Sequence, residues 1–270
     1  MHRLIWRAPL AAALLALGLL SFTSNTQAAS GTALGVKPAA AAEAEAQSRT
    51  LTVGADVFIG DRIVTGPQGQ VQILFSDRTE LVVGPNSALL LEDYLLRDDQ
   101  SVGKFAINAL SGTFRFSTGR AAKDLYEIRT PTGTIGVRGT EFDFNSSTEK
   151  LRVMLYGGAL DLCNTGKSCV TLSDQCDLGV ADTSQSVLVG NTQDFSRQDR
   201  DALKGEFPYA VAQGSLIGRF RFNHSRECLE RSSSATPPPA SLVTNPDSGP
   251  EPCNGDENCG RGDPQPGLKP

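Results

Sequence analysis

The sequence predicts an all-β fold, and a sandwich, a barrel or a stack of short β-turns would each fit it. Apolar and polar side chains alternate through residues 70–75 and 105–109, which is the period of strands that bury one face. Turn sequences rich in Gly, Pro, Asn and Asp recur about every ten residues, as in all-β domains. Before residue 195 the sequence lacks the 3.6-residue period of an amphipathic helix.

The expected strands follow one another from residue 51 onward. In order, the pattern predicts strands in 51–64, a turn at 66–69, a strand at 70–75, a turn at 76–78, strands at 81–83 and 89–96, a loop at 97–101, strands at 105–109 and 114–116, and a hairpin of 151–156 with 159–163. Between the last two groups lies the stretch Tyr126–Phe144, YEIRTPTGTIGVRGTEFDF, around which the other strands are expected to be organised.

Three glycines recur at intervals of three within this stretch. Gly133, Gly136 and Gly139, together with Arg138 and Thr140, form a structural motif. A spacing of three does not fit one flat strand, so we expect short extended pieces joined by bends, where glycine permits a positive φ or close backbone approach. A phosphate-binding loop is the alternative, but neither a helical pattern nor Gly-Lys-Ser/Thr follows.

The same residues resemble a known family. TPTGTIGVRGTEF at residues 130–142, the segment Gly60–Tyr94 and the segment Ser111–Lys123 are similar, in order and spacing, to the signature of the FecR family of periplasmic domains. The resemblance covers about residues 52–162 and departs from the family at Arg78 and Gly133, where Gly and a small non-Gly residue are usual. It implies a twisted, solenoid-like domain of stacked β-hairpins, with a β-sandwich as the alternative.

The N-terminus reads as an export signal. Residues 1–28 combine the basic residues Arg3 and Arg7, an apolar run from Pro9 to Leu20 and small residues before Ala29, where the mature chain is expected to begin. A membrane anchor is the alternative, but the apolar run is shorter than the ~20 residues that a spanning helix needs. We therefore expect a periplasmic or secreted protein without a membrane span after the leader, and a flexible Ala-rich leader at residues 29–50.

Charge and cysteine content agree with this location. The net charge is −5, and removing residues 1–28 with their two arginines makes it −7, which disfavours binding to nucleic acid. In an exported chain, six cysteines indicate disulfides, and a zinc site would need closely spaced pairs that are missing here. We expect a bridge across a hairpin, a bridge closing a long loop and a small C-terminal loop, from Cys163 with Cys169, Cys176 with Cys228, and Cys253 with Cys259.

Two C-terminal segments complete the domain organisation. The FecR-like β-domain with its disulfide-bearing hairpin is expected at residues 51–195, and a cap segment at residues 196–230. The cap segment contains a short helix near Arg197–Phe207 and should cover an end of the β-domain, since a solenoid needs its edges protected. The Pro-rich residues 231–270 hold too few apolar side chains to order, and indicate a disordered tail.

The sequence contains few residues that would support a catalytic site or a cofactor site. His224 is the one histidine after residue 28, and no Gly-x-Ser-x-Gly is present. Glu141 and Asp143 share one face of a strand, where they are expected as solvated residues; a catalytic pair would need a cleft. Arg129, Arg138 and Glu141 are expected to form an ion-pair network, and the alternative is an interaction surface at Arg129 and Glu141. We expect no cofactor and no metal.

The sequence therefore favours a non-catalytic protein that acts by protein–protein contact in the cell envelope. The FecR resemblance implies a relay of receptor occupancy, of the iron-siderophore type, from the periplasm to a sigma factor, with the receptor's signalling domain as partner. Family members carry a cytoplasmic segment and a membrane span before this domain, and here a signal peptide stands in their place, so the role transfers in part. The alternatives are a structural, envelope-associated protein and, third, a carbohydrate-active enzyme on a β-solenoid.

Overall fold

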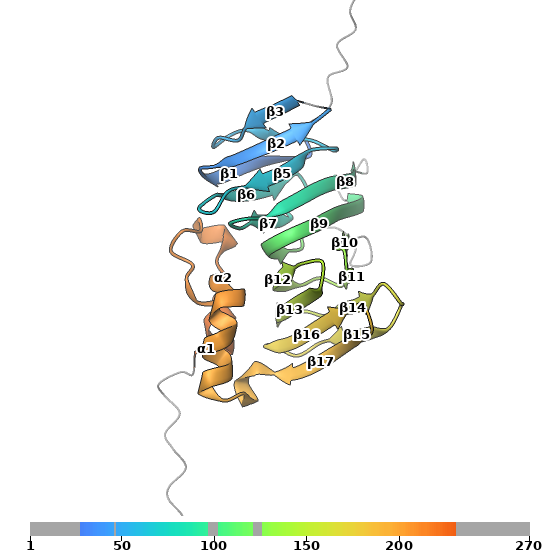
Figure 1. Ribbon diagram of the computed structural model, residues 1–270. Coiled ribbons are helices and arrows are strands. Elements are labelled where there is room, and N and C mark those ends of the chain that lie inside the picture. Colours follow the sequence, from blue (N-terminus) through green and yellow to red (C-terminus); the bar gives the residue numbers. More distant parts are fainter. Residues whose placement is uncertain (1–27, 46, 97–101, 121–125, 231–270) are drawn as a thin grey trace, which may run out of the picture. The chain divides into compact units, whose positions relative to one another are not determined.

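The computed structural model describes residues 28–45, 47–96, 102–120 and 126–230 (Figure 1). Almost all of the expected signal peptide, the expected tail at 231–270 and the Cys253–Cys259 loop lie outside the described residues. Within the described part, no helix combines the length and the apolar character required to cross a membrane.

Within the described residues, seventeen strands form one open sheet that folds into two facing layers. Layer A runs in the order β4 (Asp56–Val57), β1 (Gly31–Lys37), β6 (Gln70–Phe75), β7 (Glu80–Val83), β9 (Val102–Ser117), β12 (Glu141–Ser146), β13 (Lys150–Gly157), β16 (Asp177–Asp182) and β17 (Ser186–Asn191). Layer B runs β3 (Gln47–Thr50), β2 (Ala40–Ala44), β5 (Arg62–Thr65), β8 (Ala88–Leu96), β9, β10 (Tyr126–Arg129), β11 (Gly133–Val137), β14 (Leu160–Asn164) and β15 (Cys169–Leu172). The all-β prediction of stacked hairpins is confirmed, and the described strands do not close into a barrel.

Strand β9 belongs to both layers. Its first part pairs with β8 up to Ser111, and its second part pairs with β12 from Gly112 onward. Gly112 has a φ of 111°, and a Cβ there would overlap the side chain of Ser87. Glycine at this position therefore lets one strand leave layer B and enter layer A without a break in the chain.

The core lies between the two layers. Alternate residues of nearly every strand point inward and are buried together in one hydrophobic cluster. A chain of aromatic rings crosses it, with centroid distances of 5.0 Å for Phe75–Phe105, 5.7 Å for Phe105–Phe116 and 5.4 Å for Phe116–Phe142. Burying each such ring contributes about 1.5–3 kcal/mol to stability.

The expectation of a flexible leader at residues 29–50 is wrong. These residues form β1, β2 and β3, and β1 pairs with β6 from Gly31 to Lys37. Ala33, Ala40 and Ala42 are buried in the core. Alanine has a weak preference for strands, but here its small side chain fits between closely packed neighbours, so tertiary pairing overrides the local preference.

The cap segment is helical, as expected, but it does not cover an end of the sheet. It contains α1 (Arg197–Glu206), α2 (Pro208–Val211) and the short 3₁₀ turns η1 (Thr192–Asp194, just before the segment), η2 (Gly218–Phe220) and η3 (Ser225–Cys228). These elements lie beside the outer face of layer A (Figure 1), because that face exposes apolar side chains that need cover. The buried contacts on the sheet side come from Val82, Met154, Tyr156 and Leu178.

Candidate functional site

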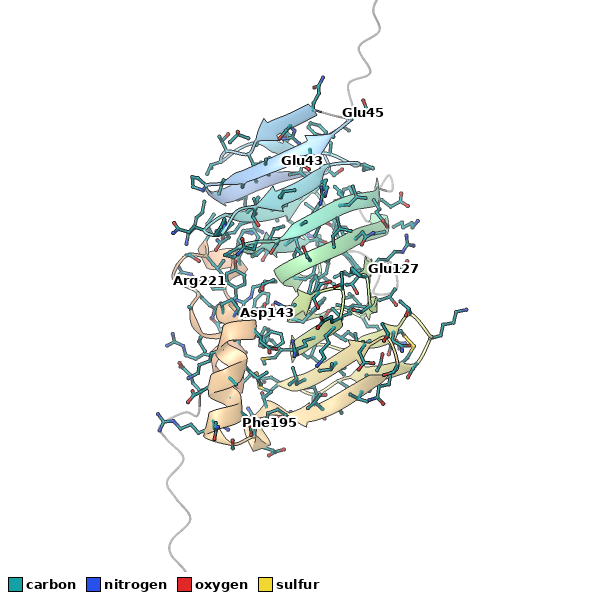
Figure 2. The ribbon with its side chains drawn as sticks, viewed as in Figure 1. Glu43, Glu45, Glu127, Asp143, Phe195 and Arg221 are labelled. Carbon is teal, nitrogen blue, oxygen red and sulfur yellow. A yellow bond between two sulfur atoms is a disulfide. The ribbon has the colours of Figure 1, made fainter. Side chains whose placement is uncertain are left out.

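A buried ion pair joins layer A to the cap segment. Arg115 in β9 and Asp143 in β12 lie directly opposite each other in the strand register. Arg115 Nε donates to Asp143 Oδ1 at 2.7 Å and Nη2 donates to Oδ2 at 2.9 Å, with 1% and 0% of the two side chains exposed. The two side chains point outward from the sheet, and Asp143 lies between the strands and the helices (Figure 2).

The cap segment supplies the remaining partners of Arg115. Its guanidinium donates to the carbonyl oxygen of Tyr209 at 2.8 Å and to Gln213 Oε1 at 2.6 Å, and it lies 4.3 Å from the ring centroid of Phe222. Gln213 in turn accepts from the Phe222 amide at 2.8 Å. A buried charge is costly unless all its donors are satisfied, so the pair depends on the cap segment being in place.

The electrostatics of this cluster keep the Arg115 guanidinium charged. The pKa of Arg115 is raised: burial opposes the charge, but the neighbouring Asp143 carboxylate outweighs that effect. Tyr156 donates to Asp143 Oδ2 at 2.9 Å, and burial, followed by the Asp143 charge, raises the pKa of its phenol well above the ordinary value. The cluster can hold the cap segment, but its carboxylate is sealed from any substrate.

The prediction that Glu141 and Asp143 are both solvated is therefore wrong for Asp143. Glu141 is exposed and lies on the same outward face of β12 as Asp143. Its carboxyl pKa is raised, first because the surrounding protein desolvates it; Arg115 lowers the pKa, Glu80 raises it and His224 lowers it. With one carboxylate sealed under the cap segment, the two cannot act as a catalytic pair.

The three glycines of the motif have three different environments. Gly133 begins β11, and a Cβ there would overlap the carbonyl oxygen of Cys163. Gly139 lies in a turn with a φ of 77°. Gly136 lies in the middle of β11, where a Cβ would meet only Asp161, at 3.9 Å. The prediction that all three glycines bend the chain is thus wrong for Gly136, which shares one strand with Gly133.

The other two motif residues lie beside Gly139. Arg138 forms an ion pair with Asp161 at 2.5 Å, and more than half of its side chain is exposed. Thr140 is buried: its amide donates to Thr118 Oγ1 at 3.1 Å, while its hydroxyl has no hydrogen-bond partner in the described part of the chain. Neither residue contacts a cluster of ionisable groups that would suggest chemistry.

The outer surface of layer B carries a set of cross-strand polar contacts, which we call the polar face. Arg129 pairs with Glu92 at 2.9 Å and with Glu127 at 2.8 Å, and Asn108 donates to Glu92 at 3.2 Å. Gly136 pairs in register with Glu127 of β10 on one side and with Asp161 of β14 on the other. Because glycine has no side chain, a strip without a side chain separates the two carboxylates. Glu127 lies on the side of the sheet away from the helices (Figure 2).

The expected network of Arg129, Arg138 and Glu141 is wrong as well. Arg129 and Arg138 belong to two separate groups of ion pairs on layer B, while Glu141 points outward from layer A. The strand alternation that follows Gly139 directs Glu141 to the opposite surface. Of the two predicted interaction residues, Arg129 lies within the polar face and Glu141 outside it.

A second buried polar cluster fixes the turn after β6. Asp77 accepts from the hydroxyls of Tyr126 at 2.7 Å and Thr79 at 2.6 Å, and its amide donates to the Tyr94 hydroxyl at 2.9 Å. Burial, and next the charge of Asp77, raise the pKa of Tyr94. Arg78 follows with a φ of 76°, in the left-handed region that favours glycine, where the FecR signature usually has Gly.

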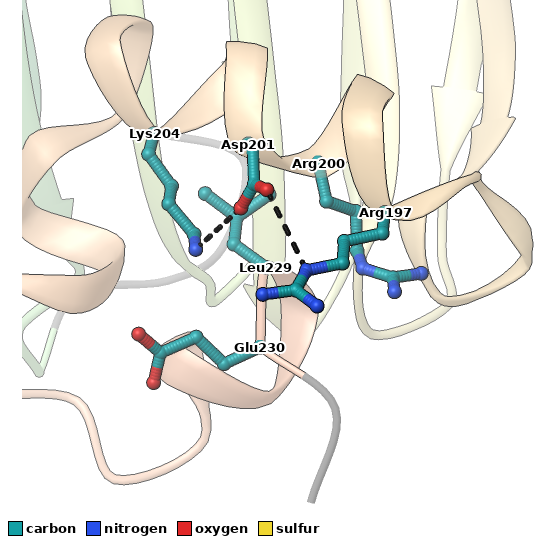
Figure 3. Close-up of a pocket in the computed structure, with 6 residues that line it drawn as sticks. All are labelled: Arg197, Arg200, Asp201, Lys204, Leu229 and Glu230. Atoms are coloured by element: carbon teal, nitrogen blue, oxygen red, sulfur yellow. Dashed lines mark hydrogen bonds and ion pairs between the residues drawn. The ribbon is translucent and has the colours of Figure 1, made fainter.

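The described residues form several hollows on the surface. A hollow of about 400 Å³ beside α1 is lined by Arg197, Arg200, Asp201, Lys204, Leu229 and Glu230 (Figure 3). Asp201 pairs with Lys204 at 2.7 Å and with Arg197 at 3.8 Å, and the lining as a whole holds three cationic and two acidic side chains. Among the described residues, no group of three His, Cys, Asp or Glu side chains could hold a metal ion.

Two of the three expected disulfides are confirmed. Cys163–Cys169 bridges the β14–β15 hairpin, and Cys176–Cys228 links the start of β16 to the end of the cap segment. His224 is exposed, with its Nδ1 3.7 Å from Glu227. It lies on the surface of the cap segment.

Sequence reasoning missed the Arg115–Asp143 pair, although the sequence holds a signal for it. Each charge stands between two phenylalanines, in Phe114-Arg115-Phe116 and Phe142-Asp143-Phe144. Since the phenylalanines point into the core, the charges must share the outer face, and opposite charges pair well across neighbouring strands. The cap segment that buries the pair could not be inferred from the two tripeptides.

Part of the chain matches a known protein family. Residues 61–161 match the family model described as "FecR protein". No curated relative matches the chain. Two crystal structures of a candidate anti-sigma factor from Parabacteroides distasonis ATCC 8503 are similar at 12% identity, with TM-scores of 0.39 and 0.40. The alignments cover 49% and 54% of this chain, and the chain spans 61% and 74% of the length of those two chains.

Proposed function

Because the chain carries a FecR-family domain at residues 61–161, we propose that it is an exported, non-catalytic protein that acts by protein–protein contact in the cell envelope. Two disulfides support export, since such bonds persist in oxidising compartments and are rare in the cytosol. The expected signal peptide supports the same location.

The observation that carries the proposal is the polar face of layer B. Its strands β5, β8 to β11 and β14 come almost entirely from the FecR-matched residues, and no helix of the described chain packs on it. The ion pairs of Arg129 and Arg138 are exposed, and such pairs contribute little to stability. They can therefore be exchanged for contacts with a partner at small cost.

Gly136 adds to this argument. Nothing in the fold requires glycine there, since a Cβ would meet ordinary van der Waals contact. A glycine inside a strand weakens the strand, and it often marks a place where another backbone approaches closely. Its position between Glu127 and Asp161 suits a partner that lays a backbone segment across the strip and bonds to the flanking carboxylates.

We propose the signalling domain of an outer-membrane receptor as that partner, with iron-siderophore-type relay as the process. This finer proposal rests on what the FecR resemblance implies. A structural, envelope-associated role, with residues 231–270 as a spacer, predicts instead a peptidoglycan contact or no protein partner. A carbohydrate-active role has lost its motivating feature, since Asp143 is fully paired beneath the cap segment.

Site-directed photo-crosslinking in the envelope tests the proposal. A photoreactive residue at Thr134, on the polar face, should give a discrete crosslinked protein, identified by mass spectrometry. The matched control is Arg197 on α1, whose side chain is 92% exposed. A receptor signalling domain captured at Thr134 alone supports the relay. Equal capture at both positions, or capture of peptidoglycan or nothing at Thr134, would contradict protein contact through this face.

A further inference from the structure

The two ends of the folded sheet differ in how their edge strands are protected. At one end the edges are β4, with two residues including Asp56, and β3, with four residues including Arg49. Short length and charge are the usual means by which proteins prevent edge-to-edge pairing. At the other end the edges are β15 and β17, and among the described strands each pairs on one side only.

At the β15–β17 end, β15 is as short as β3, but the protection by charge is missing from both edge strands. None of the residues of β15 (CVTL) or β17 (SVLVGN) is charged, and along the chain the nearest charges to β17 are Asp182 and Asp194. A bulge at Val189 leaves Val189 and the adjacent Leu188 48% and 44% exposed. These are two of the four large apolar side chains that the described chain exposes; the others are Val53 and Ile217.

The cap segment does not cover this end. Its apolar contacts are with the outer face of layer A, through residues such as Met154, Tyr156 and Val82. The core, by contrast, continues to the last strand of layer B, where Leu172 is fully buried and Val170 partly buried. A stacked β-structure normally ends in a polar cap, because an open end exposes both the core and unpaired backbone groups.

We propose that the β15–β17 end is a self-association surface, on which a second copy of this chain docks end to end. A two-fold axis perpendicular to the layers reverses the direction of every strand and places layer A of the copy beside layer A and layer B beside layer B. The same rotation therefore pairs β17 with the β17 of the copy, and β15 with the β15 of the copy, both antiparallel. Such an interface is isologous, and it extends both layers and the core across the dimer.

The spacing of the two edges favours a second copy over an unrelated strand. The net charge of −5 opposes the association of two copies, whereas the edge strands at this end are neutral and add nothing to that repulsion. A single extended peptide would pair with one edge and leave the other open. Only a partner with two edges at the same spacing satisfies both, and a second copy has this spacing by construction.

Analytical ultracentrifugation of the chain from Ala29 to Pro270, which holds every described strand and helix, tests the proposal. The expected result is a concentration-dependent shift from one to two copies. Val189→Lys should weaken the dimer about tenfold or more, because it places like charges near each other across the axis. Val53→Lys is the matched control: Val53 is 68% exposed at the other end of the sheet, so the dimer should be unchanged.

Circular dichroism and the thermal midpoint establish that both variants fold. Hydrogen exchange at residues 187–190 should be slower at high protein concentration than at low concentration in the unsubstituted chain. A mass of one copy up to about 100 μM, equal effects of Val53→Lys and Val189→Lys, or exchange in β17 independent of concentration would each overturn the proposal. If a foreign peptide or residues 231–270 covered this end instead, ultracentrifugation would give the mass of a single copy.

Discussion

Arg115 and Asp143 face each other across two neighbouring strands in a bidentate ion pair that the cap segment seals from water. The guanidinium uses the carbonyl of Tyr209 and the side chain of Gln213, both from the cap segment, to satisfy its remaining donors. The stability of the sheet and the position of the cap segment are thus coupled through one side chain.

Removing one partner of this pair should be strongly destabilising. Asp143→Ala leaves the Arg115 charge buried without a counter-charge, and we expect a loss of about 3–5 kcal/mol in the free energy of unfolding. With Arg115→Met in the same chain, the uncompensated charge is gone, so the double variant should lose less than the sum of the two single losses. Urea unfolding of the four proteins measures this coupling. Losses that add within about 0.5 kcal/mol would show that the pair is not coupled.

The glycine motif gives a prediction with an internal control. Gly133→Ala should cost about 1–3 kcal/mol, because the new methyl group overlaps the Cys163 carbonyl and forces β11 and β14 apart. Gly136→Ala, three residues away on the same strand, should change stability by less than about 0.5 kcal/mol. Thermal unfolding of both variants decides the matter, and equal losses would refute the distinction.

Replacing Arg78 by glycine should increase the stability of the protein. It occupies the left-handed region at a φ of 76°, so Arg78→Gly should stabilise the protein by about 0.5–1 kcal/mol after the greater chain entropy of glycine is allowed for. Arg78→Ala is the control, since alanine has the same backbone strain and should give no gain. A midpoint of chemical unfolding that rises for both variants would assign the effect to the lost charge and not to the backbone.

The two disulfides should contribute unequally. Cys176–Cys228 closes a loop with a sequence separation of 52, and Cys163–Cys169 one of 6. Loop entropy predicts losses of about 4 and about 2 kcal/mol when each pair is replaced by alanine. Calorimetry of the two double-alanine variants compares them directly, and a larger loss for the hairpin bridge would contradict the ranking.

Glu141 should make stability depend on pH. Its pKa is raised above the ordinary value of 4.5, chiefly by desolvation. Its contribution to stability is therefore complete below pH 4.5 and is lost as the pH rises through the folded-state pKa. Glu141→Gln should match the unsubstituted protein at pH 4 and exceed it at pH 7, by a few tenths of a kcal/mol because the side chain is exposed. Unfolding curves at the two pH values measure this difference, which should vanish if the carboxyl is fully hydrated.

Sequence pattern predicted the strands well, because alternation at positions such as Val71, Ile73 and Phe75 depends only on which side chains are buried. The pairing of β1 with β6 could not be predicted, since it joins segments more than thirty residues apart and the alanines of β1 carry little local preference. The same holds for the candidate site. Sequence reasoning proposed Arg129 as a possible interaction residue, and this role stays a prediction, whereas the burial of Asp143 depends on residues 207–222, which approach it only in the folded chain.

The bond between Cys176 and Cys228 turns the intervening residues into a covalent ring that contains β16, β17 and both helices. A protease that cuts the backbone anywhere between these two cysteines opens the ring without releasing a fragment, since the pieces remain tethered through sulfur. In an oxidising envelope, the cover over Arg115 and Asp143 is thus retained even after its backbone has been cleaved.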